Sequence, residues 1–247
     1  ERIGKVEQSR GHGKLPLMRT AILAAAALTF ALPAPAAEVA LDVGHTLADP
    51  GAISARGRGE YHFNRDLAPV VQAALAARGI AVRPINYDGR IASLSARPDV
   101  ARGSDLFLSL HHDSLPAHEQ ELWVWEGQRL SYSDRYAGFS LHVSRRNPEA
   151  TVSGRCASAI GAAMRLAGFV PTRHHYPKHP WADEENAVHW HDNLVVLHRT
   201  TMPAVLFEAG VITHRDEELQ LSDPERMARM ADAIATGVAA CLYAMPR

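Results

Sequence analysis

Apolar residues along this chain follow two alternating patterns, which predict strands and helices in turn. Short continuous apolar runs bounded by turn residues are typical of strands buried on both faces, and they occur at 38–43, 81–85, 105–110, 122–125 and 203–207. Apolar residues at helical spacing predict helices over 62–79, 94–102, 153–167 (with Ser153 as N-cap) and 224–243. Strands that alternate with helices predict a single α/β domain, whose mostly parallel twisted sheet is flanked by helices on both faces.

One long stretch, 127–192, departs from this pattern outside its predicted helix and is interpreted as an irregular insertion. Its part from Arg173 to Asp192 is polar and rich in histidine. Loops of this length inside a compact domain are usually functional or mobile. The sequence leaves open whether the stretch binds substrate or inhibits.

The first 36 residues differ from the rest and are interpreted as a leader. Met18 and Arg19 precede an apolar run over 21–32, and Ala34 and Ala36 form an Ala-x-Ala cleavage site. This order is typical of a secretory signal peptide, with Met18 as the expected start. The run is shorter than the roughly 20 residues that span a bilayer. We therefore expect a mature chain over 37–247 that is periplasmic or secreted, with no stable membrane insertion.

Composition and charge exclude several classes of protein. The chain has 247 residues, of which 47% are hydrophobic, and a formal net charge of −1. These values fit a folded globular protein and give no charge excess that would favour nucleic acid as a partner. Cys156 and Cys241 are too few for a disulfide scaffold. Because both lie on predicted helices of an exported chain, we hypothesise one disulfide between them; the alternative is two small buried apolar residues.

Residues that can carry out chemistry follow three of the predicted strands. His45 follows the first, His111 and His112 follow the third, and Glu208 follows the late one. In parallel sheets ligands bind beyond the carboxyl ends of strands, so these side chains should converge. Glu60, in a glycine-rich loop after His45, can fold back over the same edge, although it could instead only complement a helix dipole. Two histidines and a carboxylate are a common set for catalytic zinc, and a second carboxylate can take the proton of its water.

The motifs around these residues resemble the zinc-dependent N-acetylmuramoyl-L-alanine amidases, in particular their cell-wall amidase catalytic domain. The resemblance rests on 41–45 (LDVGH), 59–60 (GE), 109–111 (SLH) and 206–210 (LFEAG), with support from 49–52, Arg97 and 193–197. It implies that His45, Glu60 and His111 bind Zn²⁺, that Glu208 is the catalytic glutamate, and that 37–247 is the catalytic domain. It also implies hydrolysis of the amide bond between N-acetylmuramoyl and L-alanine in peptidoglycan.

The sequence departs from that family at three places near the site. Thr46 stands where the family usually has glycine, and His112-Asp113 stands where it has a small residue and asparagine. An aromatic residue is also missing after Gly210. None of these changes removes a proposed ligand, so they concern the specificity for substrate.

Two alternative functions stay open at this stage. One is a zinc amidohydrolase that acts on small N-acyl amino acids in a closed pocket. The other is a non-catalytic periplasmic protein that binds metal or cell wall, supported by a histidine-rich tract made of His174, His175, His179, His189 and His191. Glu208 favours an enzyme, because a binding protein needs no general base. Position within the envelope would depend on the catalytic domain itself or on a partner such as an activator protein.

Overall fold

The computed structural model describes residues 1–5 and 36–245. The chain forms two units, Glu1–Ala34 and Pro35–Arg247, and the helices and strands of the described residues belong to the second. The predicted signal peptide, apart from Ala36, lies outside the described residues. Among the residues that are described, no helix combines the length and the apolar character needed to cross a membrane.

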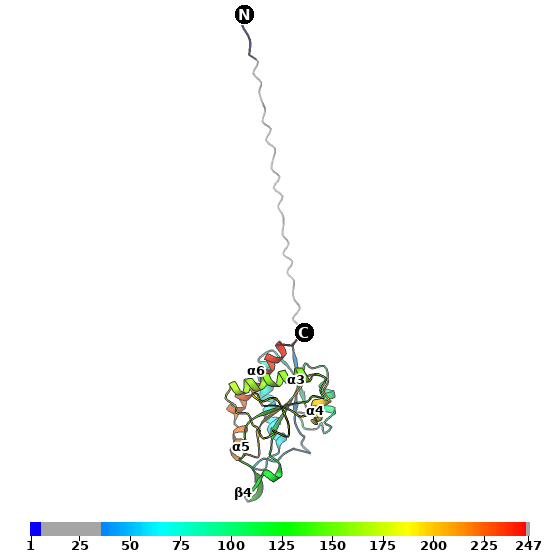
Figure 1. The fold of residues 1–247 in the computed structure, drawn as a ribbon, viewed down its shortest axis with the longest axis vertical. Coiled ribbons are helices and arrows are strands. Elements are labelled where there is room, and N and C mark those ends of the chain that lie inside the picture. The colour runs from blue at the N-terminus through cyan, green and yellow to red at the C-terminus, as the bar shows by residue number, and fades with distance from the viewer. Residues whose placement is uncertain (6–35, 246–247) are drawn as a thin grey trace. The chain divides into compact units, whose positions relative to one another are not determined.

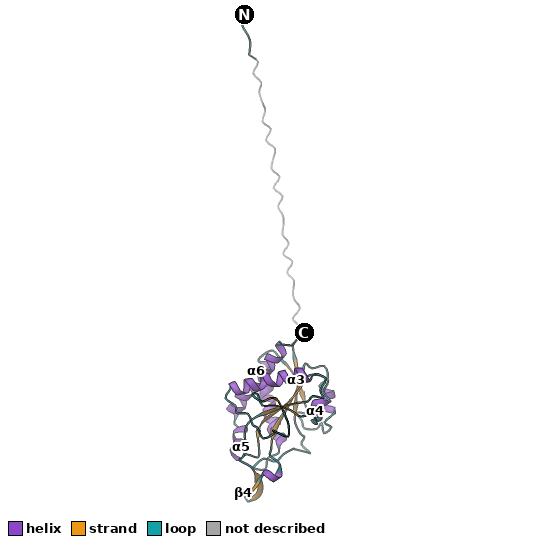
Figure 2. Cartoon of the chain, in the orientation of Figure 1, coloured by secondary structure: helices purple, strands orange, loops and turns teal. Residues whose placement is uncertain are grey.

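A seven-stranded sheet forms the centre of the folded unit (Figure 2). Its strands follow the order β2 (Ala81–Ile85), β1 (Glu38–Val43), β3 (Leu106–Asp113), β9 (Ala204–Val211), β6 (Ser140–Val143), β8 (Val188–Trp190) and β7 (Trp181–Asp183). The first four of these strands are parallel to one another, and β6 is parallel to β8, whereas β6 is antiparallel to β9 and β7 is antiparallel to β8. The predicted α/β domain with a mostly parallel sheet is therefore confirmed.

Helices cover both faces of the sheet, as predicted. The larger layer contains α1 (Glu60–Ala76), α3 (Ala150–Leu166) and α6 (Pro224–Tyr243). The smaller layer contains α2 (Ala96–Val100) and α4 (Val195–His198). Helix α5 (Arg215–Leu221) follows β9, and a 3₁₀ turn spans Ala117–Glu119. Figure 1 shows α3 and α6 side by side, in agreement with their packing. Cys156 of α3 and Cys241 of α6 form a disulfide with a Cα–Cα distance of 4.9 Å, which confirms the hypothesised pair.

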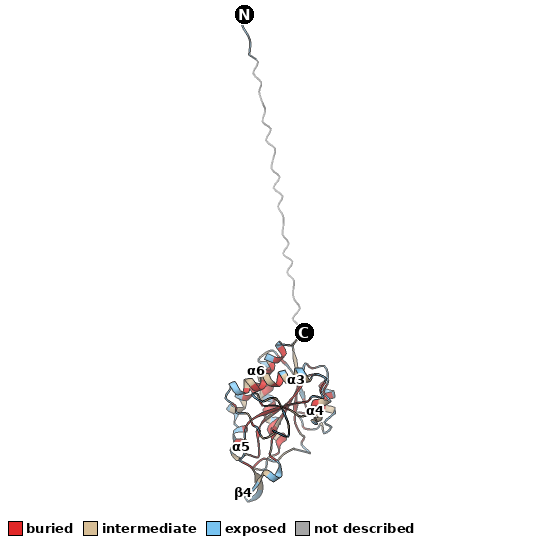
Figure 3. Cartoon of the chain, viewed as in Figure 1, coloured by how far each residue is buried: buried red, intermediate tan, exposed pale blue. Residues whose placement is uncertain are grey.

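Alternate residues of the central strands enter different cores, because successive side chains of a strand point to opposite faces. Leu106, Leu108 and Leu110 of β3 pack under the larger helix layer, whereas Phe107 packs under the smaller one. Figure 3 shows this burial as red along the strands and on the inner sides of the helices. Burial on both faces explains the continuous apolar runs of the sequence.

The segment 127–192 corrects the expectation of an irregular insertion. It contributes β5 (Gln128–Tyr132), which pairs with β4 (Glu121–Trp125) in a separate hairpin, and it also contributes β6, α3, β7 and β8. The three central-sheet strands are only three or four residues long and contain histidine and tryptophan, so no alternation of apolar residues marks them. The predicted N-cap at Ser153 is also wrong: α3 begins at Ala150, and the Ser153 hydroxyl accepts the Ala204 N–H instead.

Candidate functional site

His45 lies directly beyond the end of β1 in a backbone conformation that is unusual for a residue other than glycine. Its φ angle is +63°, in the left-handed region. The side chains of Asn86 and Arg97 each donate to the His45 carbonyl oxygen at 2.7 Å. Arg97 is 1% exposed, so these hydrogen bonds come from a rigid interior position. The fold thereby holds the imidazole of His45 at the sheet edge despite the backbone cost.

Glu60 is the first residue of α1, and its carboxylate bridges the two histidines. Its Oε2 lies 2.9 Å from His45 Nε2, and its Oε1 lies 2.9 Å from His111 Nδ1. The Asn64 side chain, one helical turn further along α1, donates to Oε1 at 3.3 Å, and the Ala52 N–H donates to Oε2 at the same distance. The glycine-rich loop folds back over the edge of the sheet, which is one of the two possibilities that the sequence left open for Glu60.

The electrostatics of this group favour an ionised carboxylate between two imidazoles. Burial alone would raise the pKa of Glu60, but hydrogen bonds from His111 and His45 outweigh it and hold the pKa well below its usual range. Burial likewise opposes protonation of His45, yet the hydrogen bond and charge of Glu60 raise the pKa of His45 above its usual value. A compact charge pair of this kind is typical of a functional site.

These three residues fit a transition-metal ion in donor type and in space. One ligand atom from each of His45, Glu60 and His111 lies within 4.8 Å of the other two. Two imidazoles and one carboxylate form a common catalytic zinc set that leaves a further position open. Glycines keep the space around them free: a Cβ on Gly44 would lie 2.4 Å from His111 Nε2, and one on Gly51 would lie 2.7 Å from Glu60 Oε2.

The structure distinguishes His111 from His112, which spacing alone could not do. His112 is 3% exposed, and its Nδ1 lies 2.7 Å from Asn64 Oδ1, away from the ligand atoms. Burial lowers the pKa of His112 to about 3, so its ring stays neutral. His112 therefore supports Asn64, which in turn holds Glu60.

Glu208 lies beside this group on the neighbouring strand. The register of β3 and β9 pairs His111 with Glu208. Its Oε2 is buried and has no hydrogen-bond partner among the described residues. Burial, together with the charges of Asp113 and Glu60, raises the pKa of Glu208 well above its usual value. A carboxyl group in such surroundings readily holds a proton, which suits general acid–base chemistry.

A cavity of about 600 Å³ joins these side chains. Its polar wall includes His45, Glu60, His111, Asp113 and Glu208, and its apolar wall includes Leu94, Leu194 and Val195. A cavity of about 750 Å³ beside Phe169 and Arg226 is larger, but residues 1–5 and 36–245 place no comparable set of ligands there. The chemistry of the chain therefore points to the smaller cavity.

Several contributing residues were missed by sequence reasoning. A sequence feature could have indicated that Asn64 lies near the site, because it follows Glu60 by one helical turn. For Asn86 the sequence gives no such indication beyond its place after β2. Arg97 was noted only as part of a motif, whereas its side chain holds the backbone of His45. Of the histidine-rich tract, His174 and His175 contact Asp113 at this edge of the sheet.

Comparisons with known proteins agree with this geometry. A family model described as N-acetylmuramoyl-L-alanine amidase matches residues 39–240. The N-acetylmuramoyl-L-alanine amidase AmiA of Salmonella typhimurium is 27% identical over 224 residues, covering 81% of this chain and 74% of the relative. The amidase Ami1 of Mycobacterium smegmatis superposes with a TM-score of 0.68 at 20% identity, covering 85% of this chain and 98% of that one. The amidase CwlD of Clostridioides difficile, solved with the GerS lipoprotein, gives 0.65 at 17%, covering 85% and 100%. At these identities the two solved structures establish a shared fold.

Proposed function

Because the chain belongs to the N-acetylmuramoyl-L-alanine amidase family and is an enzyme of this kind, we propose that it cleaves peptidoglycan with a zinc ion bound by His45, Glu60 and His111. The bond cleaved joins the N-acetylmuramoyl group to L-alanine. The observation that carries this proposal is the convergence of three ligand atoms within 4.8 Å beside Glu208, whose buried Oε2 has no hydrogen-bond partner within the described part of the chain. Membership of an enzyme family leaves the non-catalytic alternative without support.

The three ligand residues have distinct parts in the proposed site. His45 and His111 supply neutral nitrogen donors, and Glu60 supplies a negative charge that balances the cation. A zinc ion in such a set supplies Lewis acidity toward water and toward the substrate carbonyl group. Asn64 and the Ala52 N–H keep the Glu60 carboxylate in place, as outer hydrogen bonds commonly do at metal sites.

Glu208 is the general base and then the general acid in this proposal. Its carboxylate takes a proton from the attacking water as the oxygen bonds to the amide carbon. The protonated carboxyl group then gives that proton to the alanine nitrogen as the C–N bond breaks, which leaves a lactyl carboxylic acid and a free amine; the acid then ionises and the amine takes up a proton at neutral pH. The raised pKa of Glu208 suits the second step, since a carboxyl group that holds its proton can donate it to the leaving amine.

Location and partners form the last part of the proposal. We expect the chain to be exported by the leader over 1–36, because its substrate lies outside the inner membrane. The cavity beside the sheet would receive the lactyl–alanine bond of a peptidoglycan strand. An activator protein for this chain stays a prediction.

Digestion of purified peptidoglycan tests the function directly. The protein should release stem peptides with new L-alanine amino termini, detected by mass spectrometry, and a chelator should stop the release. Glu208→Gln should keep the zinc ion of this site and lose turnover by a factor of roughly 100 or more, whereas His45→Ala should lose turnover together with the zinc ion that His45, Glu60 and His111 bind. Glu225→Gln, an exposed carboxylate on α6, is the matched control and should stay active. Near-normal turnover of Glu208→Gln would refute the general-base role.

A further inference from the structure

A second group of metal-type ligands lies beside the first and has no part in the proposed reaction. The Oδ2 atom of Asp113 lies 2.7 Å from His175 Nε2 and 3.1 Å from His174 Nε2. One ligand atom from each of these three residues lies within 4.8 Å of the other two. We propose that Asp113, His174 and His175 form a second binding site for a divalent transition-metal ion of the zinc class.

The hydrogen bonding of His174 is the first argument. Its Nδ1 lies 2.9 Å from the Thr172 hydroxyl, a partner that orients the ring and can accept the Nδ1 proton. With the proton there, Nε2 carries a lone pair that faces a carboxylate oxygen. The His174 side chain is 7% exposed, and its Nε2 makes no hydrogen bond among the described residues despite the 3.1 Å approach. A cation between these atoms would satisfy both, whereas two lone pairs would repel each other.

The arrangement of the two rings is the second argument. The ring centroids of His174 and His175 are only 4.0 Å apart, and the Nε2 atoms of both rings lie close to the same oxygen of Asp113. One ion can therefore contact a nitrogen of each ring and a carboxylate oxygen together, which is the donor set that zinc-class ions use.

The second oxygen of the Asp113 carboxylate, Oδ1, has a hydrogen-bond partner of its own. Asp113 Oδ1 accepts the Ser114 N–H at 2.7 Å, which leaves Oδ2 for the ring nitrogens. This hydrogen bond fixes the carboxylate, and Thr172 fixes His174, so two of the three ligands have an outer partner. An accidental contact of exposed side chains would not need such support.

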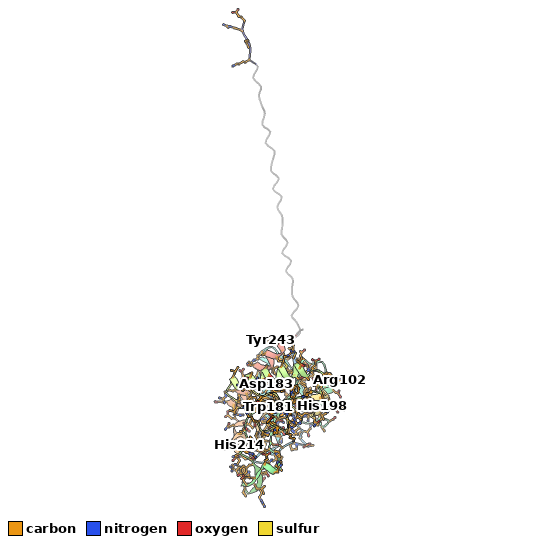
Figure 4. All side chains as sticks on the ribbon, in the orientation of Figure 1. Arg102, Trp181, Asp183, His198, His214 and Tyr243 are labelled. Atoms are coloured by element: carbon orange, nitrogen blue, oxygen red, sulfur yellow. A yellow bond between two sulfur atoms is a disulfide. The ribbon has the colours of Figure 1, made fainter. Side chains whose placement is uncertain are left out.

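Further buried imidazoles surround the second site. His142 Nδ1 and His189 Nε2 are both buried without a hydrogen-bond partner among the described residues. The ring centroid of His142 lies 4.7 Å from that of His175, and the ring of His189 lies 5.3 Å from it. Trp181, labelled in Figure 4, covers His189 with a centroid distance of 3.9 Å. Unpaired buried ring nitrogens are costly, and their concentration here points to a site built for a ligand.

The second site repeats the donor chemistry of the first on the same strand. His111 and Asp113 both belong to the end of β3, and both line the cavity of about 600 Å³. Each site offers two imidazoles and one carboxylate, a set that suits zinc and similar first-row ions better than calcium or magnesium. The second site consists of Asp113 and its own neighbours and includes none of the residues that the proposed amidase reaction uses.

Metal counting on the full chain tests the proposal. The purified protein is stripped with a chelator, loaded with excess zinc, desalted, and analysed for zinc per chain by mass spectrometry. The wild type should retain two ions. The double variant His174→Ala/His175→Ala and the single variant His45→Ala should each retain one, because each removes a different site.

Control variants separate the site from the rest of the histidine-rich tract. His179→Ala/His191→Ala changes two tract histidines whose rings stack on each other at 3.8 Å, and it should still retain two ions. Circular dichroism checks the folding of each variant, and anomalous diffraction at the zinc edge of wild-type crystals locates both ions without any substitution.

The outcomes separate this inference from the proposed function. One ion in the wild type that is lost in His45→Ala would overturn the second site and leave the proposed zinc ligands standing. One ion that is lost only in His174→Ala/His175→Ala would support the second site and overturn the first. A single anomalous peak at His45, Glu60 and His111 would likewise overturn the inference.

Discussion

Gly51→Ala offers a direct test of how the loop shapes the proposed zinc site. Gly51 has a φ angle of +76°, and a Cβ there would lie 2.6 Å from His45 Cδ2 and 2.7 Å from Glu60 Oε2. Both distances are far below van der Waals contact, so at least one proposed ligand must move. Disturbing even an outer partner of a metal ligand typically costs about 10–100-fold in metal affinity, which corresponds to about 1.4–2.7 kcal/mol. We expect at least this loss of zinc affinity.

Gly79→Ala is the matched control, because it carries the same backbone strain without the collision. Gly79 has a φ angle of +72°, and a Cβ there would meet nothing within 4 Å. Both variants should lose about 1–2 kcal/mol of unfolding free energy from the left-handed backbone, measured by urea denaturation in the presence of a chelator.

Competition with a chromogenic chelator then measures the zinc affinity of both glycine variants. Gly79→Ala should match the wild type, and Gly51→Ala should be at least about tenfold weaker. Equal zinc affinities in the two variants would refute the inference that a Cβ at position 51 displaces a zinc ligand.

Three further predictions concern stability. Removing the disulfide in Cys156→Ser/Cys241→Ser should cost about 4–5 kcal/mol of unfolding free energy, because the bond joins residues 85 positions apart; a urea midpoint equal to that of the oxidised wild type would contradict this. Arg97→Met should cost about 3–5 kcal/mol by urea denaturation, since it leaves the buried Asp42, 3.5 Å from the guanidinium, without its ion-pair partner, although the Ser109 hydroxyl still donates to it; a cost below 1 kcal/mol, roughly that of a surface change, would count against it. In chelator-treated protein, the unfolding free energy should fall as pH drops from about 6.5 toward 4. Burial lowers the pKa of His189 to about 4, so the unfolded chain binds the proton at a higher pH than the folded chain does. His189→Gln should flatten this pH dependence, and an unchanged slope would exclude His189 as its source.

The sequence was informative wherever a single physical rule controls the outcome. Strands buried on both faces must be apolar throughout, so β1, β3 and β9 were visible as runs of apolar residues. Parallel strands end at the same edge, so the sequence alone predicts that His45, His111 and Glu208 lie together. Helix α6 was also predicted with its observed bounds, because its apolar residues follow the helical period up to Tyr243.

The rest depended on tertiary contacts that no local pattern reports. Strands of three or four residues, such as β6 and β8, are too short to show a period. The hydrogen bond from the Asn86 side chain to the His45 backbone joins residues 41 positions apart. The contact between the side chains of Asp113 and His175 joins residues 62 positions apart. Such pairs are set by how the layers pack, which is why the histidine-rich tract could be noticed but not assigned.

The disulfide makes the stability of this enzyme depend on the compartment in which it is found. The loop that it closes contains Glu208 but none of His45, Glu60 and His111. In a reducing cytoplasm the bond does not persist, whereas in an oxidising envelope it does. Since whole domains are stable by only about 5–15 kcal/mol, one cross-link of this kind is a large share of the total. An exported chain would therefore have the full stabilisation by this disulfide only on the side of the membrane where peptidoglycan lies. The stabilised segment includes the strand that carries the proposed general base.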